Sequence, residues 1–166
     1  MPRTAHRAAR GPDAGGAGTA QPRAIGDDAV FDLHSANLAN IHTTLAHNLK
    51  LYAETLPIAR DVIDGRLQAR HREMVILCSG WNCAAAHQWS HHRYVTAAVG
   101  LTEAETDLLS RPPSEVPWAI QKRVLLETVD ELHDRSTVGD RTWSGRAEHY
   151  LEAELIEVVT LTALRT

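Results

Sequence analysis

The sequence predicts an all-α protein, a bundle of about seven or eight helices. From Phe31 onward, apolar residues recur at the three- and four-residue spacing of one helix face. The alternating apolar and polar pattern of a β-strand does not occur anywhere in the sequence. Glycine, proline and capping residues divide the pattern into segments of helical length, so we expect a succession of helices.

The N-terminal segment differs in composition from the rest of the chain. Residues 1–28 hold five of the ten glycines and three of the seven prolines, and Ile25 is their only large branched aliphatic residue. Such a segment buries too little apolar surface to become ordered, and it lacks the apolar stretch of a secretory signal. We therefore expect a disordered tail over 1–28 and a helical domain over 29–166.

Three helices are expected in the first half of this domain. Gly65 is a typical signal for the end of a helix, and Pro57 predicts a kink or a helix start within the second segment. The expected ranges are Ser35–Asn48, Leu51–Asp64 and Leu67–Trp81.

The third of these helices is expected to be the central, buried one. Met74, Leu77, Cys78 and Trp81 follow the spacing i, i+3, i+4 and i+7, and residues 75–76 add apolar surface on another side. A helix that is apolar almost all round packs in the middle of a bundle.

The second half of the chain contains further start and stop signals. Thr102 and Glu105 have the spacing of a capping box, which opens a helix. Pro112 and Pro113 interrupt the pattern, and Pro117 suits the first turn of a long helix that runs to about His133. The other expected helices are Ala85–Val99, which ends at Gly100, then Asp140–His149 and Glu152–Leu164.

Charge and composition exclude several classes of partner. The formal net charge is -4 and no basic stripe is present, so we expect no binding to nucleic acid. The apolar stretches are too short for a transmembrane helix. Cys78 and Cys83 would point ~140° apart on one helix, which disfavours a disulfide between them. We therefore expect reduced thiols and a cytoplasmic protein.

A carboxylate and three histidines are the candidates for chemistry. Glu73 lies on the helix that we expect to be buried, where a carboxylate needs a partner. His87, His91 and His92 follow within the next helix, and histidine transfers protons readily near neutral pH. His87 and His92 should point ~140° apart, so one small ligand reaches both only if its pocket wraps the helix or includes a second subunit.

Two other interpretations of this region remain open. Cys83, His87 and His91 recur every fourth residue, and with Glu73 they form a possible zinc site. Cys83 alone could be a reactive thiol, because a position before a helix N-terminus lowers a thiol pKa. Each histidine could also be a packed or surface side chain, which is the interpretation that we favour for His91.

Together, several motifs resemble the core of the carboxymuconolactone decarboxylase family, within the alkylhydroperoxidase D-like (AhpD-like) all-α fold. The resemblance covers about residues 33–166. The motifs are Arg72-Glu73-Met74-Val75-Ile76-Leu77, Trp81, Trp89-Ser90-His91-His92 and Gly100-Leu101-Thr102-Glu103-Ala104-Glu105, with flanking matches at 45–48, 125–126, 130–133 and 155–159.

The family has two branches, and the chain departs from both. In the peroxidase branch a pair of cysteines follows the glutamate, but the matching positions here are Ala85 and Gln88. In the decarboxylase branch, Glu73, His87 and His92 match, whereas the carboxylates on either side of the first histidine are replaced by Ala86 and Gln88. These replacements leave the natural substrate open.

The resemblance implies a cofactor-independent and metal-independent decarboxylase for a small carbonyl acid, such as a β-keto acid or an unsaturated lactone. We expect His87 to protonate the product enolate, and the Glu73–His92 pair to orient the substrate and supply a second proton. Gln88, Trp81, Trp89 and His91 are the expected substrate-binding residues.

The resemblance also implies a homo-oligomer, a trimer or a hexamer. The family's last helix is longer than the segment from Glu152 to Thr166, so we expect an exposed apolar surface there that another chain covers. Two alternative functions stay open. One is a peroxiredoxin-type oxidoreductase that uses a different thiol, and the other is a non-catalytic helical oligomer or binding module.

Overall fold

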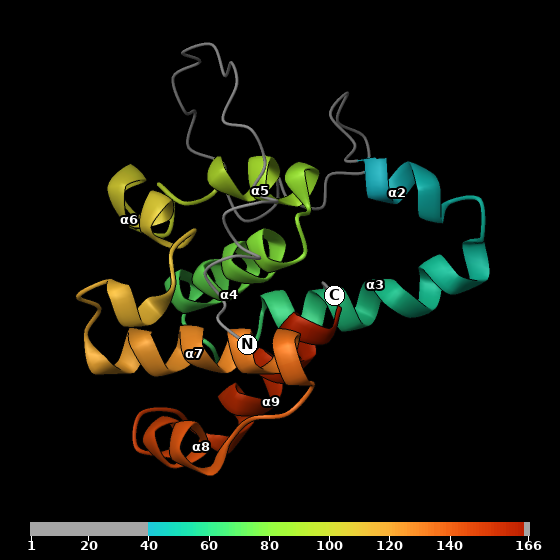
Figure 1. Ribbon diagram of the computed structural model, residues 1–166. Coiled ribbons are helices and arrows are strands. Elements are labelled where there is room, and N and C mark those ends of the chain that lie inside the picture. The colour runs from blue at the N-terminus through green and yellow to red at the C-terminus, as the bar shows by residue number, and fades with distance from the viewer. Residues whose placement is uncertain (1–39, 165–166) are drawn as a thin grey trace. The chain divides into compact units, whose positions relative to one another are not determined.

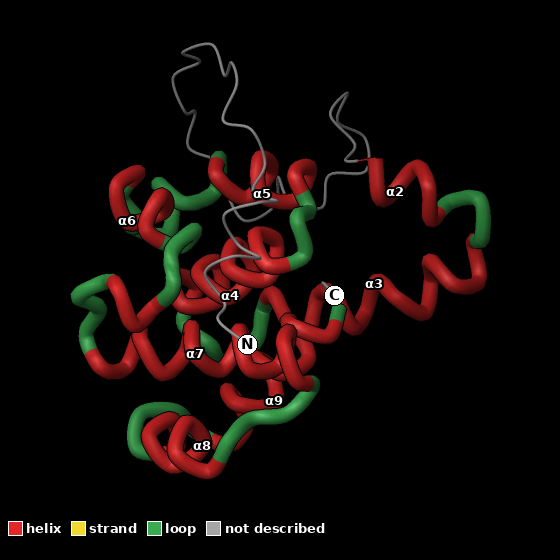
Figure 2. The backbone as a smooth tube through the Cα atoms, viewed as in Figure 1, coloured by secondary structure: helices red, strands yellow, loops and turns green. Residues whose placement is uncertain are grey.

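The computed structural model describes residues 40–164, and this part of the chain is entirely helical (Figures 1 and 2). It contains eight α-helices and one short 3₁₀ helix, and none of these residues lies in a strand. The predicted all-α class is therefore confirmed. The predicted tail over 1–28 and the beginning of the first predicted helix lie outside the described residues. None of the helices in the described range is long and apolar enough to cross a membrane.

The described residues fall into two compact units, residues 40–65 and residues 66–164. The first unit pairs α2 (Asn40–Leu45) with α3 (Leu49–Ile63). The Asn48 side chain caps α3 by accepting a hydrogen bond from the backbone N–H of Leu51, at 3.1 Å. Pro57 lies inside α3, so no helix begins there.

The second unit is built around α4 (Ala69–Asn82), which packs against α5, α7 and α9. Figure 1 shows α4 between α5 and α7, while α8 lies against the other side of α7. The remaining elements are α5 (Ala86–Arg93), α6 (Glu103–Leu108), η2 (Pro113–Glu115), α7 (Ile120–Arg135), α8 (Asp140–Ala147) and α9 (Glu152–Ala163).

The prediction that the third helix is the central, buried one is confirmed. Met74, Val75 and Leu77 of α4 are 0% exposed, and so are Leu125 and Val129 of α7, which packs on it. Burying an aliphatic side chain of this size stabilises a fold by about 1.5–3 kcal/mol. The helix that carries Glu73 is thus fixed from several sides.

Three predicted helix boundaries are wrong. The first predicted helix was expected to run to Asn48, but α2 ends at Leu45 and Asn48 caps α3. The fourth helix ends at Arg93 instead of Val99, because residues 94–100 form turns in which the N–H of Leu101 bonds to the carbonyl of Thr96. Gly100 completes these turns with a φ of 73°, which a residue without a side chain adopts easily. The long sixth helix begins at Ile120, because Ala119 has an extended ψ of 147°, and Pro117 therefore lies outside it.

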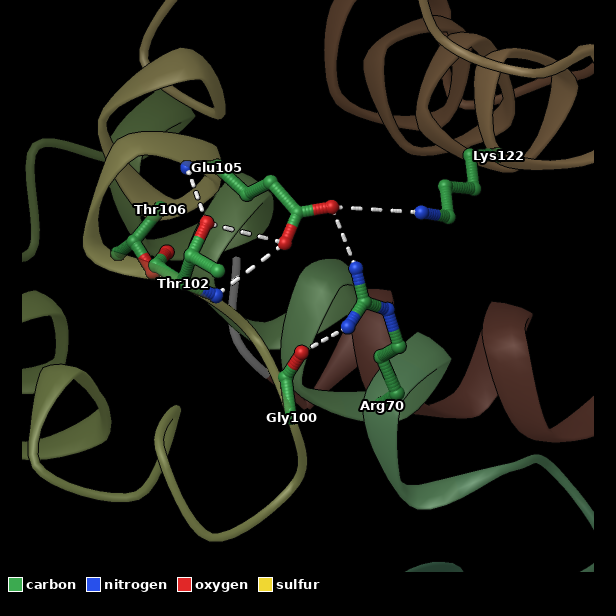
Figure 3. Close-up of polar contacts among 6 residues, drawn as sticks. All are labelled: Arg70, Gly100, Thr102, Glu105, Thr106 and Lys122. Atoms are coloured by element: carbon green, nitrogen blue, oxygen red, sulfur yellow. Dashed lines mark hydrogen bonds and ion pairs between the residues drawn. The ribbon is translucent and has the colours of Figure 1, made fainter.

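The predicted capping box is confirmed, and its glutamate also joins three helices (Figure 3). Glu105 of α6 accepts hydrogen bonds from the backbone N–H and the hydroxyl of Thr102, at 3.2 and 3.1 Å. Its other carboxylate oxygen contacts Arg70 of α4 and, at 3.4 Å, the Lys122 ammonium of α7. Arg70 also donates to the carbonyl of Gly100. Glu105 therefore holds α6 against α4 and α7.

The Glu105 network predicts a loss of stability in acid. Burial raises the pKa of Glu105, but the hydrogen bonds from Thr102 and Arg70 outweigh it and lower the pKa from 4.5 to about 2. The carboxylate therefore stabilises the fold above pH 4.5, and this contribution disappears as the pH falls from 4.5 towards 2. We expect Glu105→Gln to lower the free energy of unfolding by about 1 kcal/mol at neutral pH.

Urea unfolding of the wild type and of Glu105→Gln between pH 7 and pH 2 measures this contribution. The difference between the two proteins should shrink as the pH falls. Glu103→Gln is the matched control, since Glu103 lies in the same helical turn with a side chain 86% exposed. A difference that stays constant with pH, or that Glu103→Gln reproduces, would show that the carboxylate charge of Glu105 is not responsible.

Candidate functional site

A tight turn places α5 on the side of α4 that carries Glu73. Ala84 adopts a left-handed conformation with a φ of 54°, and the N–H of Ala85 bonds to the carbonyl of Gly80 at 2.8 Å. The Gln88 amide then donates to the carbonyl of Ile76 at 3.4 Å. The Gln88 side chain packs over Gly80, where an added Cβ would lie 3.6 Å from it, at ordinary van der Waals distance. The turn therefore sets which residues of α5 meet α4.

Glu73 and His92 form the central contact of the candidate site. The Glu73 Oε2 atom lies 2.7 Å from Nδ1 of His92, although the two residues are 19 positions apart. The Glu73 side chain is 6% exposed and the His92 side chain 15% exposed. Arg72 Nε lies 3.9 Å from the other Glu73 oxygen. The buried carboxylate thus has the partner that its burial requires.

This contact engages Nδ1 of His92 and leaves Nε2 as the other ring nitrogen. An ionised carboxylate only accepts hydrogen bonds, so with Glu73 ionised the Nδ1 atom of His92 carries the hydrogen that Glu73 Oε2 accepts. In the neutral imidazole, Nε2 then holds the lone pair and is the nitrogen that can contact a substrate.

The other two histidines extend from this pair to the exposed side of α5. The His91 ring meets the His92 ring edge-on, with centroids 5.4 Å apart. The His87 ring stacks on His91 at 6.4 Å and an interplanar angle of 20°. His87 and His91 are both exposed. His91 lies between His87 and His92, so His87 does not contact the Glu73–His92 pair directly, as the helical geometry predicts.

The remaining predicted binding residues have defined contacts on α4 and α5. Trp89 is buried and its ring lies 5.0 Å from that of Trp81, which is half-buried. The Nε1 atom of Trp81 is buried and has no hydrogen-bond partner among the described residues. Gln88 uses its amide nitrogen on the backbone of α4. The role of all three in binding a substrate stays a prediction.

The structure contradicts the prediction of a lowered thiol pKa at Cys83. Cys83 is the C-terminal cap of α4, where the helix dipole is negative, and burial raises the pKa of its thiol, with the nearby Cys78 adding to the effect. Its sulfur lies 3.7 Å from Nδ1 of His133. A raised pKa reduces the thiolate fraction and hence the nucleophilicity near neutral pH. Cys78 and Cys83 are both free thiols, as expected.

The four predicted zinc ligands do not meet at one point. Among residues 40–164, no three His, Cys, Asp or Glu side chains are placed so that together they would hold a metal ion. Cys83 turns towards His133, Glu73 contacts His92, and His87 and His91 remain as a pair on the surface of α5.

A buried polar cluster between α4 and α7 was not predicted from the sequence. Asp130 of α7 is buried and accepts a hydrogen bond from Asn82 at 2.8 Å, while the Cys78 thiol lies 3.6 Å from the same oxygen. The sequence signal for this cluster was Asp130 itself, a carboxylate directly after the apolar residue Val129 on the predicted long helix. Its partners come from a helix about 50 positions earlier, which the pattern of α7 does not reveal.

A second buried pair links α4 to the segment that follows α8. Tyr150 lies 3.3 Å from Nδ1 of His71, and both residues are buried. Burial lowers the pKa of His71, and the positive charges of Lys122 and Arg70 lower it further. Burial also raises the pKa of Tyr150. Both side chains are therefore neutral near pH 7, which suits a structural contact.

Comparisons with models of protein families, with curated proteins and with solved structures find no match to this chain.

Proposed function

We propose that this protein is a cofactor-independent decarboxylase of the carboxymuconolactone decarboxylase type, acting on a small β-keto or lactone carboxylic acid. The observation that carries the proposal is the buried Glu73 carboxylate, 2.7 Å from Nδ1 of His92. A buried carboxylate–imidazole pair beside further histidines supports the proposal, because positioned imidazoles can transfer a proton to a carbanion. The motifs that resemble the family contain these same residues.

The reaction needs a substrate that carries its own electron sink. The bond between the carboxylate carbon and the α-carbon breaks, carbon dioxide leaves, and the electron pair passes into the neighbouring carbonyl to give an enolate. An imidazolium then donates a proton to the α-carbon and is protonated again from water. In this proposal His87 donates that proton to the α-carbon. His92, oriented by Glu73, supplies a second proton to the developing oxyanion through Nε2, and this proton returns to Nε2 when the carbonyl forms again, so that one proton is consumed for each carbon dioxide released.

The placement of His87 restricts how a substrate can lie. Because the His91 ring stands between His87 and His92, a substrate that meets both must extend along the exposed edge of α5. The predicted trimer or hexamer offers another solution, in which a second subunit closes the site over this edge. Either arrangement makes His91 a contact of the substrate.

Release of carbon dioxide from a panel of β-keto acids and carboxylated lactones tests the proposal. The wild-type protein should release carbon dioxide from at least one substrate, and His87→Ala should lower kcat by about 10²-fold or more. His149→Ala is the matched control, because His149 follows α8, which packs on α7 and not on the site. Light scattering on the same samples measures the assembly.

The possible outcomes separate the three functions. Near-wild-type turnover in His87→Ala would overturn the assignment of His87 as the proton donor. If the assembled protein releases no carbon dioxide from any member of the panel, the decarboxylase proposal fails and a binding module becomes the favoured function. Peroxide consumption without carbon dioxide release would favour the oxidoreductase. The raised pKa of Cys83 argues against this function, because it disfavours the reactive thiolate.

A further inference from the structure

The largest fully buried side chain among the described residues is a charged one, Arg146 on α8. It is 0% exposed, and its Nε, Nη1 and Nη2 atoms have no hydrogen-bond partner in the part of the chain that the structure describes. A guanidinium carries five N–H donors and keeps its positive charge near neutral pH. Because a buried donor without an acceptor is costly, and a buried charge more so, Arg146 is a strong donor that the fold leaves unsatisfied.

The neighbouring carboxylate does not supply the missing acceptor. Burial lowers the pKa of Arg146, and the negative charge of Glu131 on α7 raises it, so the two residues lie within electrostatic reach. However, one Glu131 oxygen accepts from the N–H of Gly139 at 2.7 Å, and the other accepts from the Thr142 hydroxyl at 2.9 Å. The second oxygen also pairs with Arg135 at 3.1 Å. Two arginines thus share one carboxylate, and this cluster carries an excess of one positive charge.

Arg146 lies directly beneath a surface tryptophan. Its Cζ atom is 4.0 Å from the centroid of the Trp143 ring, and Trp143 is 50% exposed. This stacking stabilises the cation, but it covers only one face of the guanidinium. The N–H bonds lie in the plane of the group, so the ring does not satisfy them. On this side a single exposed ring separates the unsatisfied donors from solvent.

We propose that Arg146 anchors a binding site for a small oxyanion, a carboxylate or a phosphate, with Trp143 as its cover. The oxygens of these anions match the fork of guanidinium donors, so two of them bind side by side in its plane. A shift of the exposed Trp143 ring opens the path from solvent to these donors. The site lies on α8, which packs on α7, and it shares no residue with the proposed decarboxylase.

Thermal unfolding of the full chain in a Tris–chloride buffer of constant ionic strength tests the proposal without any need for turnover. Sodium phosphate and sodium acetate each replace chloride in a separate titration, and the anion that binds more tightly identifies the ligand class. At least one of them should raise the melting temperature along a saturating one-site curve, by about 3 °C or more. Arg146→Met should weaken this binding by about tenfold or more. Arg141→Met, at an exposed position of the same helix, is the matched control and should leave the curve unchanged.

The stability of Arg146→Met in chloride alone separates a binding residue from a structural one. Methionine is of similar length and has no unsatisfied donor, so this variant should melt at or above the temperature of the wild type. A variant that melts well below the wild type, or that does not fold, would show that Arg146 holds the fold together and would overturn the proposal.

Two results with the anions would also overturn it. One is a wild type whose melting temperature responds to neither phosphate nor acetate, and the other is a response that Arg146→Met keeps in full. Binding should further change the tryptophan fluorescence, and this change should disappear in Trp143→Phe. A fluorescence change that persists in Trp143→Phe would reject Trp143 as the cover of the site.

Discussion

For the proposed decarboxylase, replacing Glu73 by glutamine is expected to lower kcat for carbon dioxide release by about 10²- to 10⁴-fold while the protein stays folded. Glutamine has the same size and its side-chain oxygen still accepts the hydrogen bond from Nδ1 of His92, so the ring keeps its position. The negative charge is lost, however, and the imidazolium form of His92 loses its stabilisation inside the protein. Turnover should therefore fall although the geometry is preserved.

A matched control and a folding measurement separate this catalytic role from a structural one. A catalytic Glu73 predicts that kcat falls in Glu73→Gln while circular dichroism and urea unfolding show a protein that stays folded. Glu115→Gln, at an exposed position in η2, is the control and should leave kcat unchanged. A normal kcat in Glu73→Gln would reject Glu73 as part of the catalytic pair.

Replacing Glu157 by alanine is expected to lower the free energy of unfolding by about 3 kcal/mol. The two carboxylate oxygens of Glu157, on α9, accept hydrogen bonds from the backbone N–H groups of Arg66 and Leu67, both at 2.8 Å. These groups directly precede α4, whose N-terminal dipole also favours a negative charge. Alanine removes both acceptors. Leu67 is only 2% exposed, so water replaces the acceptor of its N–H poorly, whereas the Arg66 N–H is exposed and water reaches it.

Urea unfolding of a graded pair of variants measures this effect. Glu157→Gln keeps one acceptor oxygen and should lose about half of the stability that Glu157→Ala loses. Glu148→Gln, at an exposed position after α8, serves as the control for removal of one acidic charge. Equal stabilities of Glu157→Ala and Glu148→Gln would show that the carboxylate does not hold the start of α4.

Most helix boundaries were predictable because their causes are local. The side chains of Thr102 and Glu105 cap each other within one turn, so their spacing alone locates the start of α6. The apolar residues around Met74 identify α4 as buried for a similar reason, since no face of that helix is polar enough to meet water. The end of α5 at Arg93 was not predicted. The amino acids at 94–100 are compatible with a helix, but the segment forms turns that end at Gly100.

The candidate site was predictable only in part. The motifs identified Glu73, His87 and His92, and the contact between Glu73 and His92 is present. The helical periodicity of α5 also predicted that His87 points away from that contact. The stacking of His91 between the other two histidines was not predicted, because it depends on the rotation of exposed rings and not on their spacing along the helix.

The sequence by itself determined that the described chain is all-helical and that α4 is its buried centre, and it marked Glu73 and three histidines of the next helix as the candidates for chemistry. Only the tertiary structure decided which of the three histidines meets Glu73, how Glu105 ties α6 to α4 and α7, and how Glu157 holds the start of α4. The physical reason is distance along the chain. Periodicity and capping act over one or two helical turns, whereas these contacts join residues 17 to 91 positions apart.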